Sequence, residues 1–278
     1  MSEYQYYEFR AIDRSLTQAD KEELRRISSR ARITSRSFVN HYDFGDFKGD
    51  AWEFLERWFD LHLYVANWGT RRLMIRLPAS SIPQATLDRL VMSVDEFEYR
   101  HAGDYLIISV TQDVEDIDDD SWMLDEDGFL TALAPLRDEL MRGDSRMLYL
   151  VWLIGFGYDA YEDDATEPQP GIGPLTPALE AFASFFLIDP ALVAAAAERP
   201  AVLPPTMTAK QRRAILTSLP EEEKTAFLLR ALDGDPHLPT DLGMRLLAGT
   251  ARTEPAPEVP PRTVGELMRA AVRHRGNR

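Results

Sequence analysis

The amino-acid sequence predicts an α+β protein, in which a mixed sheet with helices is followed by an all-α helical bundle. Segments rich in aromatic and β-branched residues, which favour strands, lie before residue 112. From residue 128 onward, apolar residues recur at helical spacings between short turns that contain Pro or Gly. The predicted units are 1–112 (α+β domain), 113–127 (acidic linker), 128–249 (helical bundle), 250–262 (Pro-rich linker) and 263–278 (basic tail helix).

The first unit is expected to contain about five strands and three helices. Tyr4–Ile12 and Ile33–Phe44 have extended character, and Thr17 with Asp20 marks a helix start between them. Asp50 should cap an amphipathic helix that ends before Asn67, because its apolar residues lie three and four positions apart: Trp52, Leu55, Trp58, Phe59 and Leu63.

Alternating side chains then predict a half-buried strand over Arg71–Leu77, which Pro78 closes. Ser81 and Gln84 suggest a capping box for a short helix, and Phe97–Tyr99 with Tyr105–Val110 reads as a hairpin. Helices are expected in the second unit and the tail over Leu130–Leu140, Met147–Phe156, Ala178–Phe186, Pro190–Ala197, Lys210–Leu216, Pro220–Leu232, Leu238–Leu247 and Val264–Arg273. Two of these helices have start signals, Thr208 with Gln211 and Ser218 with Glu221.

The composition limits the possible chemistry and location. The 278 residues include no cysteine, which excludes disulfides, thiolate nucleophiles and cysteine-ligated zinc. No secretory leader is evident before Asp13. The longest apolar run, Met147–Phe156, is far shorter than the roughly twenty residues that span a bilayer, so we expect a buried helix, no membrane association and a cytoplasmic location.

Negative charge is concentrated in one segment of a chain whose net charge is −15. Residues 95–127 contain thirteen acidic residues and one basic residue, Arg100. This balance argues against nucleic-acid binding, which depends on phosphate neutralisation, and favours a basic protein partner. The predicted partner-binding residues are Asp116, Asp118, Asp119, Asp120, Asp125, Glu126 and Asp127.

The sequence predicts neither a metal site nor a cofactor. The run Asp116–Asp120 resembles the start of a calcium loop, but Ser121 occupies the position that needs Gly, and Asp127 the position of the bidentate Glu. No two histidines have metal-binding spacing, and the phosphate-loop, dinucleotide and nucleophile-elbow motifs are all missing from the sequence.

Two polar loops are the only candidates for a catalytic site. The first runs from Asn40 to Asp50 and the second from Asn67 to Arg72. If both loops met at one sheet edge, they would supply donors, acceptors and a proton-transfer histidine. The candidate catalytic residues are His41, Asp46, Lys48, Arg71 and Arg72. The alternative interpretation is that the loops form turns, with arginines that solvate a sheet face.

Three motifs carry a resemblance to other proteins. They are Tyr6-Tyr7-Glu8-Phe9 with Ala11-Ile12-Asp13-Arg14, Gly45-Asp46-Phe47-Lys48-Gly49-Asp50, and Tyr64-Val65-Ala66-Asn67-Trp68-Gly69-Thr70-Arg71-Arg72. In these motifs the chain resembles an uncharacterised family of bacterial hypothetical proteins. The resemblance implies a bacterial, cytoplasmic protein and assigns no activity.

The leading functional prediction is a non-enzymatic interaction or regulatory protein that binds a protein partner partly through the acidic segment. One alternative is an enzyme, a hydrolase or a phosphate-substrate enzyme, that uses the two polar loops. Another is a component of a stress or phage-defence pathway. Whether the basic tail helix docks on the body or frays is left open.

Overall fold

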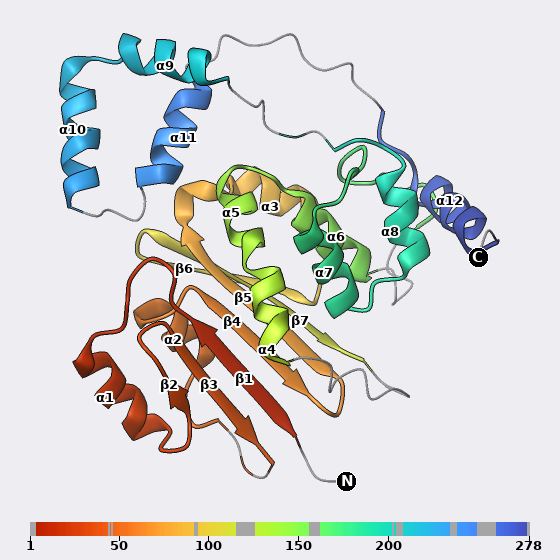
Figure 1. The fold of residues 1–278 in the computed structure, drawn as a ribbon. Coiled ribbons are helices and arrows are strands. Elements are labelled where there is room, and N and C mark those ends of the chain that lie inside the picture. Colours follow the sequence, from red (N-terminus) through yellow and green to blue (C-terminus); the bar gives the residue numbers. More distant parts are fainter. Residues whose placement is uncertain are drawn as a thin grey trace.

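The computed structural model describes residues 4–43, 45, 47–91, 94–114, 126–155, 162–201, 203, 208–233, 238–248 and 260–276. A seven-stranded antiparallel sheet runs through this part of the chain in the order β2-β3-β1-β4-β5-β7-β6 (Figure 1). The strands are β1 Gln5–Arg10, β2 Arg32–Ile33, β3 Ser37–Tyr42, β4 Leu61–Ala66, β5 Thr70–Pro78, β6 Phe97–Ala102 and β7 Tyr105–Asp113.

Helices flank the sheet and follow it in the chain. They are α1 Gln18–Ile27, α2 Ala51–Arg57, the 3-10 helix η1 Ala79–Ser81, α3 Gln84–Leu90, α4 Glu126–Leu133, α5 Pro135–Met141, α6 Arg146–Ile154, α7 Pro177–Phe185, α8 Pro190–Ala197, α9 Ala209–Ser218, α10 Glu221–Leu232, α11 Leu238–Ala248 and α12 Val264–Gly276. None of the helices in the described ranges is long and apolar enough to cross a membrane.

The helix starts confirm three of the predicted signals and contradict two. Thr17 and Thr208 form capping boxes, and the Asp50 carboxylate accepts from two backbone N–H groups of α2. Neither α3 nor α10 has a side-chain cap, because each begins directly after a proline. The Ser218 hydroxyl donates instead to the Ile215 carbonyl of the preceding helix.

The predicted long helix after Asp50 is wrong beyond Arg57, where α2 ends and the chain enters β4. Both faces of this central strand are buried, and its Leu63 continues the three- and four-residue spacing of the apolar residues of α2, which imitates a longer helix. Every neighbouring pair of the seven strands is antiparallel, which corrects the expected mixed sheet of about five strands.

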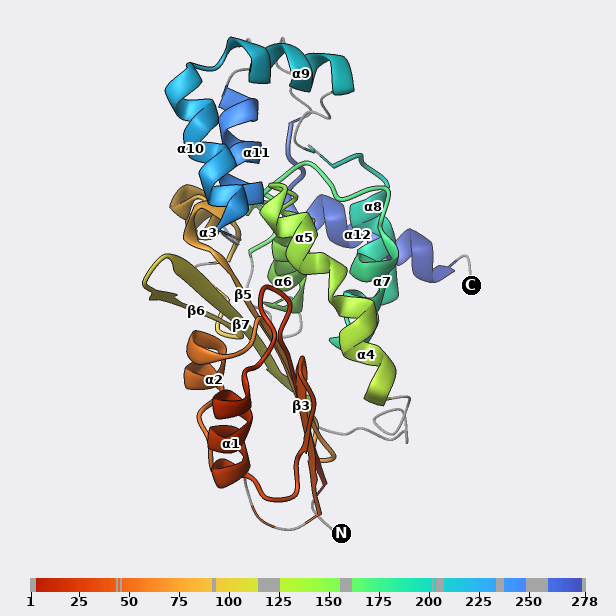
Figure 2. The same cartoon turned by 60° about the vertical axis from the view of Figure 1, so that its left-hand side comes forward.

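Helices cover both faces of the sheet (Figure 2): α1 and α2 lie on one side and α4 to α7 on the other. On the second side, Leu63 and Ile75 of the strands belong to the same buried cluster as Leu136, Leu150 and Phe182 of the helices. One continuous core thus joins residues on either side of the predicted 113–127 boundary. A separate all-helical bundle is not confirmed.

The core on the opposite face is aromatic and encloses a histidine. Phe9, Phe38, Phe54 and Phe59 pack there, and the fully buried ring of His62 stacks on Phe9 with centroids 4.0 Å apart. The His62 Nδ1 atom lies 3.0 Å from the Glu8 carbonyl oxygen, while Nε2 has no hydrogen-bond partner among the described residues. Burial lowers the pKa of His62 to about 3, so the ring is neutral in the folded protein at physiological pH.

The basic tail helix docks on the body. Val264, Leu267, Ala270 and Ala271 of α12 are buried, and the helix packs against α8. Before it, the predicted exposed linker is wrong at Arg262, which is 4% exposed. Its guanidinium forms an ion pair with the fully buried Glu167 carboxylate at 3.0 Å, which also accepts from the Tyr149 hydroxyl at 2.8 Å.

The contact between α8 and α12 makes α9 to α11 an insertion between two helices that pack together. In both Figures 1 and 2 these three helices stand at one end of the molecule, away from the sheet. The insertion reaches the body through α11, which contacts η1 and whose Asp241 carboxylate accepts from the Ser80 hydroxyl at 3.1 Å.

Replacing Arg262 should destabilise the docked C-terminal segment. Arg262→Gln leaves the Glu167 carboxylate buried without its closest cation, and loss of one partner of a buried ion pair costs about 3–5 kcal/mol. Urea titration of the two proteins measures this loss. The matched variant Arg273→Gln removes an exposed cation of α12 and should change the free energy of unfolding little. Equal effects of the two substitutions would contradict the structural role of Arg262.

His62 should make stability depend on pH. The unfolded chain binds a proton at this side chain near pH 6.5 and the folded chain only near pH 3. The free energy of unfolding therefore falls as pH decreases from 6.5 towards 3, by up to about 1.4 kcal/mol per pH unit. His62→Gln should remove this part of the slope in urea titrations across that window, whereas His101→Gln, at an exposed position of the hairpin, should keep it. An unchanged slope in His62→Gln would refute the assignment.

Candidate functional site: an arginine-lined hollow

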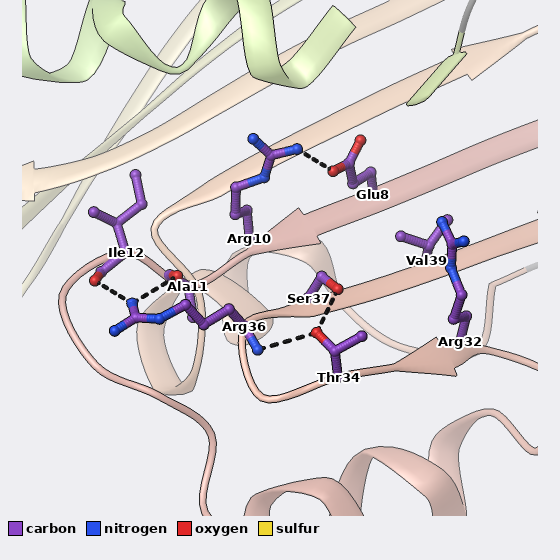
Figure 3. A pocket seen from close by; sticks show the side chains of 9 residues that line it. All are labelled: Glu8, Arg10, Ala11, Ile12, Arg32, Thr34, Arg36, Ser37 and Val39. Carbon is purple, nitrogen blue, oxygen red and sulfur yellow. Dashed lines mark hydrogen bonds and ion pairs between the residues drawn. The ribbon is translucent and has the colours of Figure 1, made fainter. Parts of the chain in front are cut away.

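A hollow of about 710 Å³ lies on the half of the sheet that the helical layer leaves uncovered. On this side the most extensive contacts of α4 and α5 with the sheet are with β4 and β5, and the hollow is lined by residues of β1, β2, β3 and the loops beside them. Figure 3 shows its side chains, among which are three arginines and one carboxylate: Arg10, Arg32, Arg36 and Glu8.

Strand alternation and register bring these side chains to one face. Glu8 and Arg10 are two residues apart on β1 and therefore point to the same side of the sheet. Glu8 pairs with Val39 on β3, and Val39 pairs with Arg32 on β2. Side chains that are far apart in the sequence thus form one row across three strands.

Hydrogen bonds hold the arginines of the hollow in place. Arg10 Nη2 donates to Glu8 Oε1 at 2.7 Å and to Thr131 Oγ1 of α4 at 3.1 Å. The other oxygen of Glu8 accepts from the Tyr6 hydroxyl at 2.9 Å. Arg36 Nη1 donates to the Ile12 carbonyl at 2.6 Å. The two guanidiniums are therefore oriented before any ligand binds.

The charge of the hollow is opposite to that of the whole molecule. Three guanidinium groups and one carboxylate surround it, in a chain of net charge −15. A guanidinium presents several N–H donors in a planar fork that matches a carboxylate or a phosphate. The arrangement can therefore bind an anion, and its Glu8 carboxylate is already engaged by Arg10 and Tyr6.

A buried network of charges supports the floor of the hollow at Ile12. The Asp60 carboxylate accepts from the backbone N–H of Ile12 at 2.6 Å and of Asp13 at 3.0 Å, and it pairs with Arg76 at 2.7 Å. Arg137 of α5 donates to the Asp13 carboxylate at 2.8 Å and to the Arg76 carbonyl at 2.7 Å. The end of β1 is thereby tied to β5 and to the helical layer.

The two carboxyl groups of this network shift in opposite directions. Burial by itself raises the pKa of Asp60, but the positive charges of Arg76 and Arg137 outweigh it and the pKa is lowered. Burial and the charge of Asp60 raise the pKa of Asp13. Asp60 is the charged centre of the network, since it is fully buried and has both cations beside it.

The candidate catalytic residues do not converge. His41 and Arg71 lie on the same sheet face, in a row that runs through Tyr6 and Val65 across four strands. Three strand spacings correspond to about 14 Å. His41 is exposed and its Nδ1 atom lies 2.8 Å from the Tyr4 hydroxyl. Arg71 is buried, where desolvation lowers its pKa, and it donates to the Phe185 carbonyl.

The other candidates lie on the opposite side of the sheet or outside the described residues. Arg72 follows Arg71 on β5, so it points to the other face, where its Nε donates to Thr111 at 2.9 Å. Lys48 is exposed next to Phe47, which packs against the aromatic core of that face. Asp46 lies outside the described residues. The predicted meeting of the two loops is not observed for the residues that the structure describes.

The predicted acidic contact falls mostly outside the described part of the chain. This applies to Asp116, Asp118, Asp119, Asp120 and Asp125, while Glu126 and Asp127 form the start of α4. Binding of a basic partner there stays a prediction. Within the described ranges, no three His, Asp or Glu side chains come together as metal ligands would.

Sequence inspection missed the hollow because its arginines come from β1, β2 and the turn between β2 and β3. One signal was present, since Glu8 and Arg10 alternate with the aromatic Tyr7 and Phe9 on β1. That alternation indicates a strand with a polar face. The alternation does not reveal that Arg32 of β2 lies on the same face, next to Val39 of β3.

In comparisons with known proteins, no family model, curated protein or solved structure matches this chain. The resemblance to the uncharacterised bacterial family stays a prediction.

Loss of the Asp60 charge should weaken the contacts that connect the end of β1 with β5 and α5. Asp60→Asn leaves Arg76 and Arg137 without their shared buried anion, and disruption of such a pair costs about 3–5 kcal/mol. The free energy of unfolding in urea should fall accordingly. Glu53→Gln, which removes an exposed partner of Arg57, serves as the control and should have little effect. A loss no larger than that of the control would show that the network does not stabilise the fold.

Proposed function

We propose that this chain is a non-enzymatic interaction protein that binds an anionic segment of a protein partner in the arginine-lined hollow. The observation that carries the proposal is the clustering of Arg10, Arg32 and Arg36 around one open surface of an acidic molecule. Clustered guanidiniums recognise acidic or phosphorylated segments of proteins through charge-assisted hydrogen bonds.

The open shape of the hollow favours a peptide over a small metabolite. Volume alone does not discriminate, because small-molecule pockets measure about 300–1,000 Å³. Such pockets bury most of the surface of their ligand, however, whereas this hollow is open to solvent beside the uncovered strands. An extended chain with carboxylates can lie across the uncovered strands and place its charges beside successive arginines.

The chemistry of the lining supports binding rather than catalysis. Both oxygens of Glu8 already accept hydrogen bonds, from Arg10 and from Tyr6. The Ser37 hydroxyl lies 2.7 Å from the Thr34 hydroxyl and forms no pair with a base in the described structure. A serine nucleophile needs an adjacent base to react, and none accompanies Ser37 among the described residues.

A labelled acidic peptide tests the proposal. Fluorescein-labelled hexaglutamate should bind the wild type in fluorescence anisotropy at physiological ionic strength, where charges beyond about 8 Å are screened and the nearby arginines dominate. The double variant Arg32→Gln/Arg36→Gln should weaken binding at least about tenfold, because each hydrogen bond to a charged group contributes about 1.5–3 kcal/mol.

The matched control is Arg26→Gln/Arg30→Gln, which removes the same charge from exposed positions in and just after α1. It should bind the peptide like the wild type. No binding by the wild type, or equal weakening in both double variants, would contradict the proposed site.

A further inference from the structure

The α9 to α11 insertion has almost no core of its own. No residue of α9 or α10 is buried. In the described part of the insertion, the buried hydrophobic side chains are Leu219 and Leu246. Short helices are marginal in water without tertiary packing, and among the described residues of the insertion only these two leucines are buried hydrophobic side chains.

An apolar surface faces outward from the insertion. Leu228 is 67% exposed, Leu229 56% and Leu232 84%, and all three lie on the outer side of α10. Leu216 of α9 is exposed as well. The inner side of α10 is tied to α11 by Arg230 with Asp241 and by Arg245 with Glu223, both at 2.6 Å. The leucines are therefore held away from the rest of the chain.

Residues 208–248 carry no net charge. The net charge of the chain is −15, but this segment has six basic and six acidic residues. Two copies of the segment therefore do not repel each other overall. The segment stands at one end of the molecule, away from the sheet, where a second copy can reach it (Figure 1).

Opposite charges on adjacent helices make the surface complementary to itself. Lys210, Arg212 and Arg213 give α9 three positive charges and no negative one, and α10 begins with Glu221, Glu222 and Glu223. A two-fold axis places α9 of one copy beside α10 of the other, and the same contact then forms twice. Arg212, Arg213 and Glu222 form no ion pair among the described residues and can make this contact.

We infer that the protein forms a two-fold homodimer in which the outer leucines of α10 pack against those of a second copy. Removal of apolar side chains from water favours association, and the interface would bury three leucines from each copy. Charge pairs between α9 and α10 then set the register of the two copies. The inference does not depend on the proposed function of the hollow.

Sedimentation equilibrium of the full-length protein tests the inference. The wild type should be dimeric, and Leu228→Ser/Leu232→Ser should be monomeric with unchanged helix content in circular dichroism. Val272→Ser serves as the control, because it removes an exposed side chain from α12, outside this surface, and should stay dimeric. A wild type that is monomeric up to about 1 mM, or a dimer that persists in the leucine variant, would overturn the inference.

Charge reversal tests the two-fold arrangement independently. Arg212→Glu/Arg213→Glu makes α9 negative, and Glu221→Lys/Glu222→Lys makes the start of α10 positive. Each variant alone should be monomeric, since both contacts then join like charges. An equimolar mixture should form a heterodimer, because each contact is again between opposite charges. Monomers in the mixture, or dimers of either variant alone, would contradict the arrangement.

Discussion

The buried carboxylate of Asp60 is the point at which the separate layers of the molecule are joined. It accepts from the backbone where β1 ends and pairs with Arg76 of β5, and Arg137 of α5 completes the network through Asp13. A buried charge is tolerated only when partners surround it, so the strand end, the sheet and the helical layer must adopt one relative position. The floor of the hollow at Ile12 is fixed by the same bonds.

A second buried carboxylate, Glu167, plays a similar part at the other end of the chain. It holds Arg262 and the Tyr149 hydroxyl, and so brings the C-terminal helix back to the body. As α12 packs on α8, the intervening helices α9 to α11 form an appendage in which few of the described hydrophobic side chains are buried. The two buried ion-pair networks thus fix the layers of the body. The α9 to α11 insertion lies outside these networks and exposes the leucines of α10.

The success of the sequence predictions depended on how local the signals were. Thr17 and Thr208 begin helices as predicted, since a capping box is complete within four residues. β4 was mistaken for helix because Leu63 continues the three- and four-residue spacing of the apolar residues of α2, so the local pattern did not mark the end of the helix. The described candidate catalytic residues lie apart for a related reason, as Arg71 and Arg72 are adjacent in sequence but project to opposite faces of β5.

By itself, the sequence determined the α+β class, the positions of most helices, and the distribution of charge along the chain. These properties arise from residue type and from spacing within one or two turns. Only the tertiary structure decided that Arg10, Arg32 and Arg36 share a surface, that Arg262 is buried, and that the leucines of α10 are exposed. The physical reason is that burial and pairing depend on segments brought together from distant parts of the chain, and no local pattern encodes which segments will meet.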